Sequence, residues 1–230
     1  MFARTVKVSL IALGLAAVVA GVSVAGPQPG PHFSAGILAG YNAGTGIQFN
    51  GRLSDFAAGF PLGVKLGVGY ATGEPGKATD ARRIFINNAT NGVPEESAHS
   101  WDFRLDFEYP VKLFHLKRAY LVGGPRYTRF LANFKFVGGN EDFDVKTNTW
   151  GVGVGLETMF AISSRVDLVF NGGYDYFPKA TLTGHDTSYS PDGDDVNPRE
   201  DYTYSDADKA INQPKHEFRL LAGFSYNFGL

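Results

Sequence analysis

The sequence predicts an all-β fold in which eight antiparallel strands run up and down and close into a transmembrane β-barrel. The first observation is that eight segments alternate between apolar residues and polar or small ones, as strands with two different faces do. The second is that the apolar face carries many of the aromatic residues, which make up 14% of the chain. The third is that short connections alternate with long polar ones, as in outer-membrane barrels.

The N-terminus has the three-part layout of a secretory signal peptide. Arg4 and Lys7 precede a long apolar run, and small residues lead up to Ala25. We therefore expect residues 1–25 to be a signal peptide that is cleaved after Ala25, and a transmembrane anchor of marginal length is the alternative. The Pro/Gly-rich stretch 26–31 is expected to be a short linker, which favours cleavage.

Residues 32–230 are expected to form the barrel, and the period of two identifies its strands. The clearest is the fourth, in which Trp101, Phe103 and Leu105 alternate with Asp102 and Arg104. The expected strands are 32–41, 45–55, 62–71, 100–109, 119–136, 143–162, 165–177 and 216–230.

The chemistry of the two faces favours a membrane barrel over a soluble sandwich, which would also alternate. Charges of both signs recur on one face, whereas bulky aromatic side chains occupy the other, often toward strand ends, as in the interfacial girdles of membrane barrels. The expected girdle residues are Tyr41, Trp101, Tyr109, Trp150, Phe160, Tyr174, Tyr176 and Phe228. The chain has no cysteine, which excludes a disulfide scaffold, and its net charge of −2 gives no reason to expect nucleic acid.

The polar face is assigned to the lumen, where the two signs of charge nearly balance. Because side chains fill the interior of an eight-stranded barrel, we expect ion pairs to plug it. A proton or ion path is the alternative. Arg104 is expected to pair with Asp102 or Asp106, and small replacements of lumen-facing Gly153 are expected to be mild compared with Arg at Leu105 or Val154. The expected lumen network is Arg52, Lys65, Asp102, Arg104, Asp106, Glu108, Arg126, Glu157, Asp167, Asp175, Glu217 and Arg219, with Arg165 in or near the lumen.

With the N-terminus in the periplasm, the short turns lie inside and the long polar loops 73–98 and 184–213 lie outside. The fifth to seventh strands exceed the 9–11 residues needed to cross a membrane, so we expect them to continue above its surface. The acidic loop 184–213 could hold a divalent cation, but it lacks the spacing of an EF-hand, and a solvated loop is the preferred interpretation. No metal and no cofactor are assigned.

No catalytic residue is assigned either. His99 and Ser100 are neighbours in a strand and point to opposite faces. His32 and Ser34 share a face, but they stand at the periplasmic start of the first strand, the opposite end from the His and Ser of lipid A deacylases with a similar architecture. A Ser/His/acid set assembled from distant strands stays open.

Two segments, AYLVGGPRYTRF at 119–130 and LLAGFSYNFGL at 220–230, together with the eight strands, resemble the small OmpA/OmpX-type outer-membrane barrels. The resemblance implies the outer membrane of a Gram-negative-type bacterium, contact with its lipid and lipopolysaccharide, and a monomer. It also implies insertion by the barrel-assembly machinery, which would read an assembly signal at the closing strand. That signal would be Phe224, Tyr226, Phe228 and Leu230, although many relatives end in Phe itself.

The expected function is therefore a structural or surface-interaction role for a barrel with a plugged lumen and long extracellular loops. A narrow, porin-like channel for small solutes is the first alternative. An enzyme that modifies lipid A or phospholipid is the second.

Overall fold

The computed structural model describes residues 30–55, 60–113 and 116–228. The expected signal peptide, most of the linker that follows it, and Leu230 of the expected assembly signal lie outside these residues.

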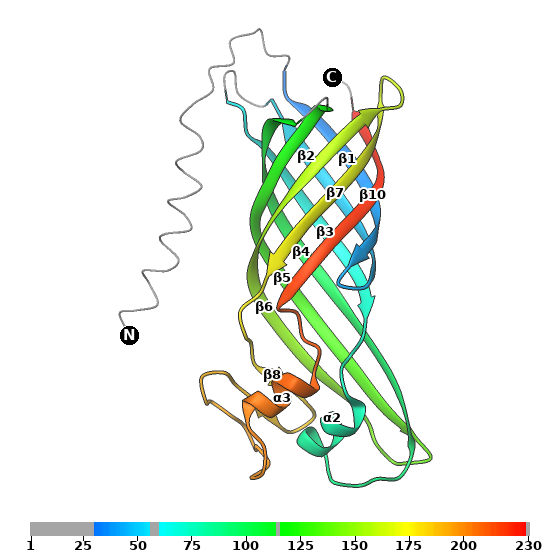
Figure 1. Ribbon diagram of the computed structural model, residues 1–230, viewed down its shortest axis with the longest axis vertical. Helices are drawn as coiled ribbons and strands as arrows, with labels where there is room; N and C mark the ends of the chain where they lie inside the picture. Colours follow the sequence, from blue (N-terminus) through cyan, green and yellow to red (C-terminus); the bar gives the residue numbers. More distant parts are fainter. Residues whose placement is uncertain (1–29, 56–59, 114–115, 229–230) are drawn as a thin grey trace, which may run out of the picture.

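Eight strands pair with their neighbours around a closed ring (Figure 1). β1 pairs with both β2 and β10, and the ring is completed where β5 pairs with β6. All of these pairings are antiparallel, which confirms the predicted eight-stranded barrel. The barrel strands are β1 (His32–Asn42), β2 (Thr45–Ser54), β3 (Gly63–Gly73), β4 (Val93–Leu113), β5 (Leu116–Val137), β6 (Asp142–Ala161), β7 (Val166–Tyr176) and β10 (His216–Phe228).

The strands differ in length, and not in the way that the sequence suggested. β4, β5 and β6 have 21, 22 and 20 residues, whereas β7 has 11. The long strands are therefore the fourth to sixth, not the fifth to seventh. β4 was expected to begin at Ser100, because Pro94, Glu95 and Glu96 hide its pattern. It begins at Val93 because β5 supplies a partner up to Val137.

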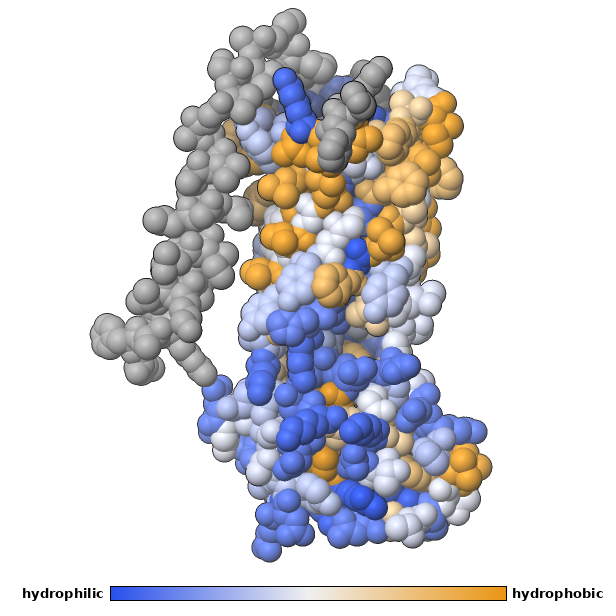
Figure 2. All heavy atoms as spheres, in the orientation of Figure 1, coloured by the Kyte–Doolittle hydropathy of each residue, from blue (hydrophilic) through white to orange (hydrophobic). Residues whose placement is uncertain are grey.

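Large apolar side chains gather around the outside of one end of the barrel. Leu66, Trp150 and Phe218 are 62%, 67% and 69% exposed. Figure 2 shows this apolar region in orange at the end where both described termini lie, which we call the termini end, and a polar region at the opposite end. No helix within the described part of the chain is long and apolar enough to cross a membrane.

The two faces of the long strands exchange character part of the way along. Up to Thr128 the inward side chains of β5 include charged and polar ones, such as Arg126 and Thr128, beside apolar Val122, but from Phe130 to Phe136 they are all apolar and buried. The outward side chains change the other way, from Tyr127 to Arg129. β6 makes the same change between Val145, which is apolar and inward, and Trp150, which is apolar and outward.

At the end opposite the termini end, the two long connections cover the apolar inward face. The expectation that these connections are polar loops is therefore wrong. One contains α2 (Ala78–Phe85), and the other contains β8 (Leu182–Thr183), β9 (Ser188–Tyr189) and α3 (Tyr204–Ala210). β8 extends the sheet by pairing with β6, α2 lies against β4 and β5, and α3 packs against α2 in the same hydrophobic cluster (Figure 1).

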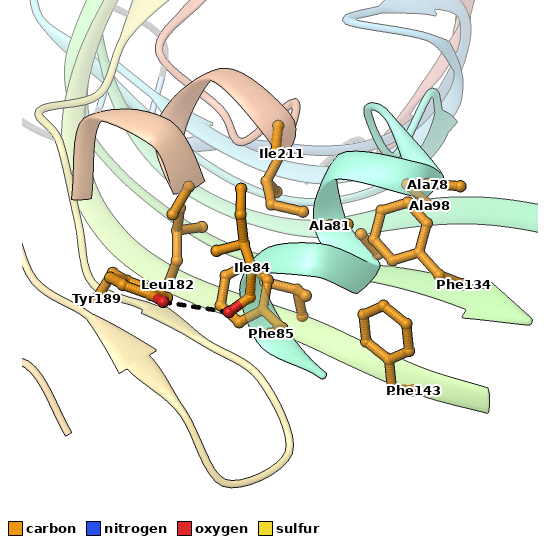
Figure 3. Packing of buried hydrophobic residues seen from close by; sticks show 14 of the residues in the cluster. Ala78, Ala81, Ile84, Phe85, Ala98, Phe134, Phe143, Leu182, Tyr189 and Ile211 are labelled. Carbon is orange, nitrogen blue, oxygen red and sulfur yellow. Dashed lines mark hydrogen bonds between the residues drawn. The ribbon is translucent and has the colours of Figure 1, made fainter. Parts of the chain in front are cut away.

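We call this assembly of the two connections and the ends of β4–β6 the cap, and the end of the barrel that carries it the cap end. Phe85 of α2 meets Tyr189 of β9 edge to face, and the Tyr189 hydroxyl donates to the Ile84 carbonyl at 3.1 Å (Figure 3). The cap thus has a hydrophobic core of its own, like a soluble domain. Its buried residues include Ala78, Ala81, Ile84, Phe85, Ala98, Phe134, Phe143, Leu182, Tyr189 and Ile211.

Candidate functional site

The structure places all twelve residues of the expected lumen network on the inward face. Eleven of them are buried, and Glu217 is partly buried. Nine of them form two clusters along the barrel axis. Asp167 lies at the termini end, and Asp102 and Glu217 lie toward the cap end.

The cluster nearer the cap is built around Asp175 of β7. Its carboxylate accepts hydrogen bonds from Arg104 of β4 at 2.9 Å, from Arg126 of β5 at 3.0 Å and from Arg219 of β10. Arg126 also donates to Asp106 at 2.6 Å. The expected pairing of Arg104 with Asp102 or Asp106 is therefore wrong: the guanidinium reaches across the lumen to β7 instead of along its own strand.

Glycines make room for these arginines. Arg104 lies opposite Gly67 in the register, Arg126 opposite Gly151, and Arg219 opposite Gly173. A Cβ on Gly173 would stand 2.6 Å from the Arg219 Nη2 atom. Each arginine therefore lies beside a glycine on the neighbouring strand. Because glycine has no side chain, the guanidinium can extend over that strand.

The second cluster lies nearer the termini end and balances two cations with two carboxylates. Arg52 Nε lies 2.5 Å from Glu108, and Lys65 Nζ lies 2.6 Å from Glu157 and 3.4 Å from Glu108. Asn171 links the two clusters, since it donates to Glu157 and accepts from Arg219, both at 2.9 Å. Because isolated buried charges are costly, this linkage stabilises a lumen filled with side chains.

A small cavity of about 440 Å³ opens at the termini end. Asp167 lies beside it and pairs with Arg118 at 2.5 Å. Arg165, which was expected in or near the lumen, lines this cavity at the mouth of the lumen; it is exposed at the rim and donates to the Tyr226 hydroxyl at 3.2 Å. The reason is that Arg165 precedes β7 and belongs to the turn.

A second cavity, of about 300 Å³, opens at the cap end of the lumen, and Asn42 and Glu217 are among its lining residues. Asn42 donates to Asp102 at 2.8 Å, and Asp102 forms no ion pair in the described part of the chain. The two cavities have no lining residue in common, and the two charged clusters occupy the barrel between them.

The expected girdle residues all lie on the outward face. Near the cap end, Tyr70 contacts Trp101 and Tyr127 contacts Trp150, with ring centroids 5.1 and 5.0 Å apart. Sequence reasoning left Tyr70 and Tyr127 out of the girdle, although alternation alone would have placed both outward. Of the eight expected residues, Tyr109 and Tyr174 are partly buried and the others are exposed: Tyr41, Trp101, Trp150, Phe160, Tyr176 and Phe228.

The closing strand carries three of the four expected assembly residues on its outward face. Phe224, Tyr226 and Phe228 are all exposed. Phe33 of β1, which lies opposite Phe228 in the register, contacts it with a centroid distance of 5.3 Å and the two rings tilted by 30°. The seam between the first and last strands is thus covered by aromatic side chains at the termini end.

His32 and Ser34 line the cavity at the termini end, as their place in the sequence indicated. The acidic loop is folded, because its carboxylates bind nearby donors. Asp195 accepts from the Ser190 amide at 2.6 Å, Asp206 caps α3 together with Thr203, and Asp208 pairs with Lys215 at 2.6 Å. Within the described residues, no group of three or more acidic, histidine or cysteine side chains is arranged to hold a metal.

One buried cation ties α2 to the tip of the β5–β6 hairpin, a contact that sequence reasoning missed. Arg82 donates to Glu141 at 2.5 Å and to the Asn91 carbonyl at 2.6 Å, and its guanidinium lies 4.4 Å from the centre of the Phe136 ring. Hydrogen bonds from Arg82 and Asn87 lower the pKa of the Glu141 carboxyl to about 2.

No protein-family model matches the chain, and no curated protein matches it. Solved structures do. A major outer membrane protein from Thermus thermophilus is similar with a TM-score of 0.67 and 24% identity, over 86% of this chain and 99% of that one.

Two further structures match with TM-scores below 0.5, which is too low to carry an argument about the fold. Neisserial surface protein A has a TM-score of 0.34 and 15% identity, over 86% of this chain and 95% of that one. CarO from Acinetobacter baumannii has a TM-score of 0.39 and 14% identity, over 89% of this chain and all of that one. The Thermus protein and the closed ring of strands together confirm the predicted fold: this chain is a closed, eight-stranded antiparallel β-barrel, similar in fold to that outer membrane protein.

Proposed function

We propose that the protein is an integral outer-membrane barrel with a closed lumen, which presents the cap outside the cell as a surface for contacts. The observation that carries this proposal is the convergence of Arg104, Arg126 and Arg219, from three different strands, on Asp175 of a fourth. Buried ion pairs that reach across the lumen support a closed barrel, because side chains can fill the interior of an eight-stranded barrel. The exposed apolar band supports the membrane location, because soluble monomers rarely expose apolar surface on this scale.

The role proposed is not enzymatic. His32 lies at the termini end, which would face the periplasm, and its neighbour Ser34 is almost fully buried. The folded cap, in contrast, offers charged and polar side chains at the opposite end, where they would meet the medium.

Single-channel recording of the purified protein at high salt tests the closed lumen. We expect no reproducible conductance steps from protein that migrates on a gel in its heat-modifiable, folded form and is inserted in the bilayer. Reproducible large steps would overturn the proposal and favour a narrow channel for small solutes.

Cysteine labelling on intact cells tests location and orientation, since the natural chain has no cysteine. Asp194→Cys in the cap should react with a membrane-impermeant maleimide. Ser164→Cys, at the exposed β6–β7 turn of the termini end, should react only after the outer membrane is permeabilised. The reverse pattern would mean that the barrel is oriented the other way.

A further inference from the structure

A groove of about 990 Å³ lies on the outer, apolar face of the barrel, over β2 to β6. It follows a break in the β4–β5 ladder, where pairing stops at Arg104↔Arg126 and resumes at Phe107↔Gly123. Pro125 lies in this gap and has no N–H to donate, so a ladder bond is missing here. Phe49, Leu66, Phe103, Pro125, Tyr127 and Trp150 are among the lining residues.

Arg129 lines the groove at its cap end, on the outward face of β5. Its cross-strand neighbours are Trp101 and Asn148, and its neighbours along the strand are Tyr127 and Leu131. His99 and Lys146, which lie opposite Leu131 in the register, are diagonal neighbours of Arg129. None of the outward positions around Arg129 carries a carboxylate.

Two other outward cations on the extended strands β5 and β6 have acidic partners. Lys135 lies 3.9 Å from Glu95, and Lys146 lies 3.4 Å from Asp144. Arg129 forms no ion pair within the described residues, although it stands at the level of the aromatic girdle. A guanidinium there favours an anion that it can bind through two parallel hydrogen bonds, and phosphate has that geometry.

We propose that the groove and Arg129 form a site for one lipid with an anionic, phosphate-bearing headgroup. One acyl chain would lie in the groove along Leu66 and Pro125, and the phosphate would bind Arg129 beside Trp101. This inference rests on the proposed function, since the groove meets lipid only if the barrel spans a membrane, and meets the outer leaflet only if the cap lies outside.

The chain's tryptophans allow a direct test, because it has two and one of them, Trp150, lines the groove. Trp101→Phe leaves Trp150 as the only tryptophan. This protein is reconstituted into phosphatidylcholine vesicles with rising mole fractions of either phosphatidic acid or phosphatidylcholine that carries brominated chains, which quench tryptophan fluorescence on contact. We expect phosphatidic acid to half-quench Trp150 at about a fivefold lower mole fraction.

Two variants in the same background separate a built site from general attraction to a positive surface. Arg129→Gln should abolish the preference, whereas Lys135→Gln, on the same face of the same strand, should keep it. Gly51 lines the groove, and a Cβ there would meet only Phe33 atoms at 3.7 and 3.9 Å. Gly51→Leu should therefore fold, fill the groove and remove the preference while Arg129 remains.

The outcomes for the proposed function and for this inference are distinguishable. If brominated phosphatidylcholine does not quench Trp150 at all, the barrel is not in the bilayer and the proposed function fails. If brominated phosphatidylcholine does quench Trp150, the membrane location is supported. The lipid site is then wrong if phosphatidic acid quenches no better than phosphatidylcholine, or if it keeps its advantage in Arg129→Gln.

Discussion

At the scale of single residues, the lumen depends on glycines as much as on charges. Gly153 of β6 is the sharpest example, because a Cβ there would stand 1.9 Å from the Asp175 Oδ1 atom and 2.6 Å from Arg126 Nε. The ion pair between these two side chains occupies the space directly over Gly153. Even a small replacement here should therefore be costly. That small polar replacements are milder than Arg at Leu105 or Val154 stays a prediction.

Gly153→Ala should cost about 1–3 kcal/mol of unfolding free energy, the usual range for a side chain forced into a full interior. Gly69→Ala is the matched control, since Gly69 also faces the lumen but a Cβ there would meet the Asp102 Cβ at 3.6 Å, an ordinary contact. Denaturant titration in lipid vesicles measures both. Equal stability of the two variants would mean that the network over Gly153 is not packed as described.

Asp175→Asn should be the most destabilising of the charge-removing changes, because it deprives three buried guanidinium groups of one shared anion. A cost of about 3–5 kcal/mol is expected. Arg104→Ala should cost less, since Asp175 keeps two cationic partners. Asp102→Asn is the control, because Asp102 forms no ion pair within the described residues. The same titration ranks the three, and a larger loss for Asp102→Asn would contradict the geometry.

At the scale of the strand, the exchange of faces along β5 and β6 divides each strand into two environments. In the part near the termini the outside is apolar and the inside charged, whereas in the cap the arrangement is that of a soluble protein. Each strand therefore serves two cores, and the boundary runs past Arg129 and Asn148, which are paired in the register.

An arginine placed on the outward face of β6 should report this boundary. Val154→Arg should cost about 2–4 kcal/mol if the residue lies near the middle of the membrane. Asn148→Arg, on the same face of the same strand beyond Trp150, should change the unfolding free energy little. Similar costs at both positions, measured in vesicles, would place the boundary elsewhere.

At the scale of the whole molecule, the cap and the barrel are joined through continuous strands but are stabilised differently. The barrel has a charged lumen, whereas the cap has an apolar core that is fastened at α2 by Arg82 and Glu141. Acid should therefore loosen α2, because protonation of Glu141 removes the charge that pairs with Arg82.

The pKa of Glu141 is lowered from 4.5 to about 2 in the folded protein. A depressed carboxyl pKa stabilises the fold above the ordinary value and loses that contribution as the pH falls toward the folded value. Protection of the α2 amides against hydrogen exchange should thus decrease between pH 4.5 and 2. Glu141→Gln should remove this dependence. The pKa of Asp206 is also lowered, but Asp206 belongs to α3, so its protonation affects the α3 amides, which are measured separately from those of α2.

The sequence was sufficient for the number of strands and for their faces within the barrel below the cap, because alternation such as that of Trp101 to Phe107 reports burial directly. The partners within the lumen could not be predicted, since Arg104 and Asp175 meet across the barrel and no local pattern records that distance. The cap could have been found. Phe143 and Val145 are out of phase with Trp150 and Val152, and such a slip marks a strand whose faces exchange.

This exchange of faces along β6 also limits the thickness of the membrane that the outward apolar surface can match. Along β6, the outward apolar stretch from Trp150 to Phe160 spans a depth of about 25 Å at the usual rise and tilt of barrel strands. A thicker bilayer would draw Asn148 and Arg129 into hydrocarbon, and the cap, folded directly above them, leaves the strands no apolar surface to extend the match. The molecule is therefore suited to a thin bilayer, a property that bacterial outer membranes have.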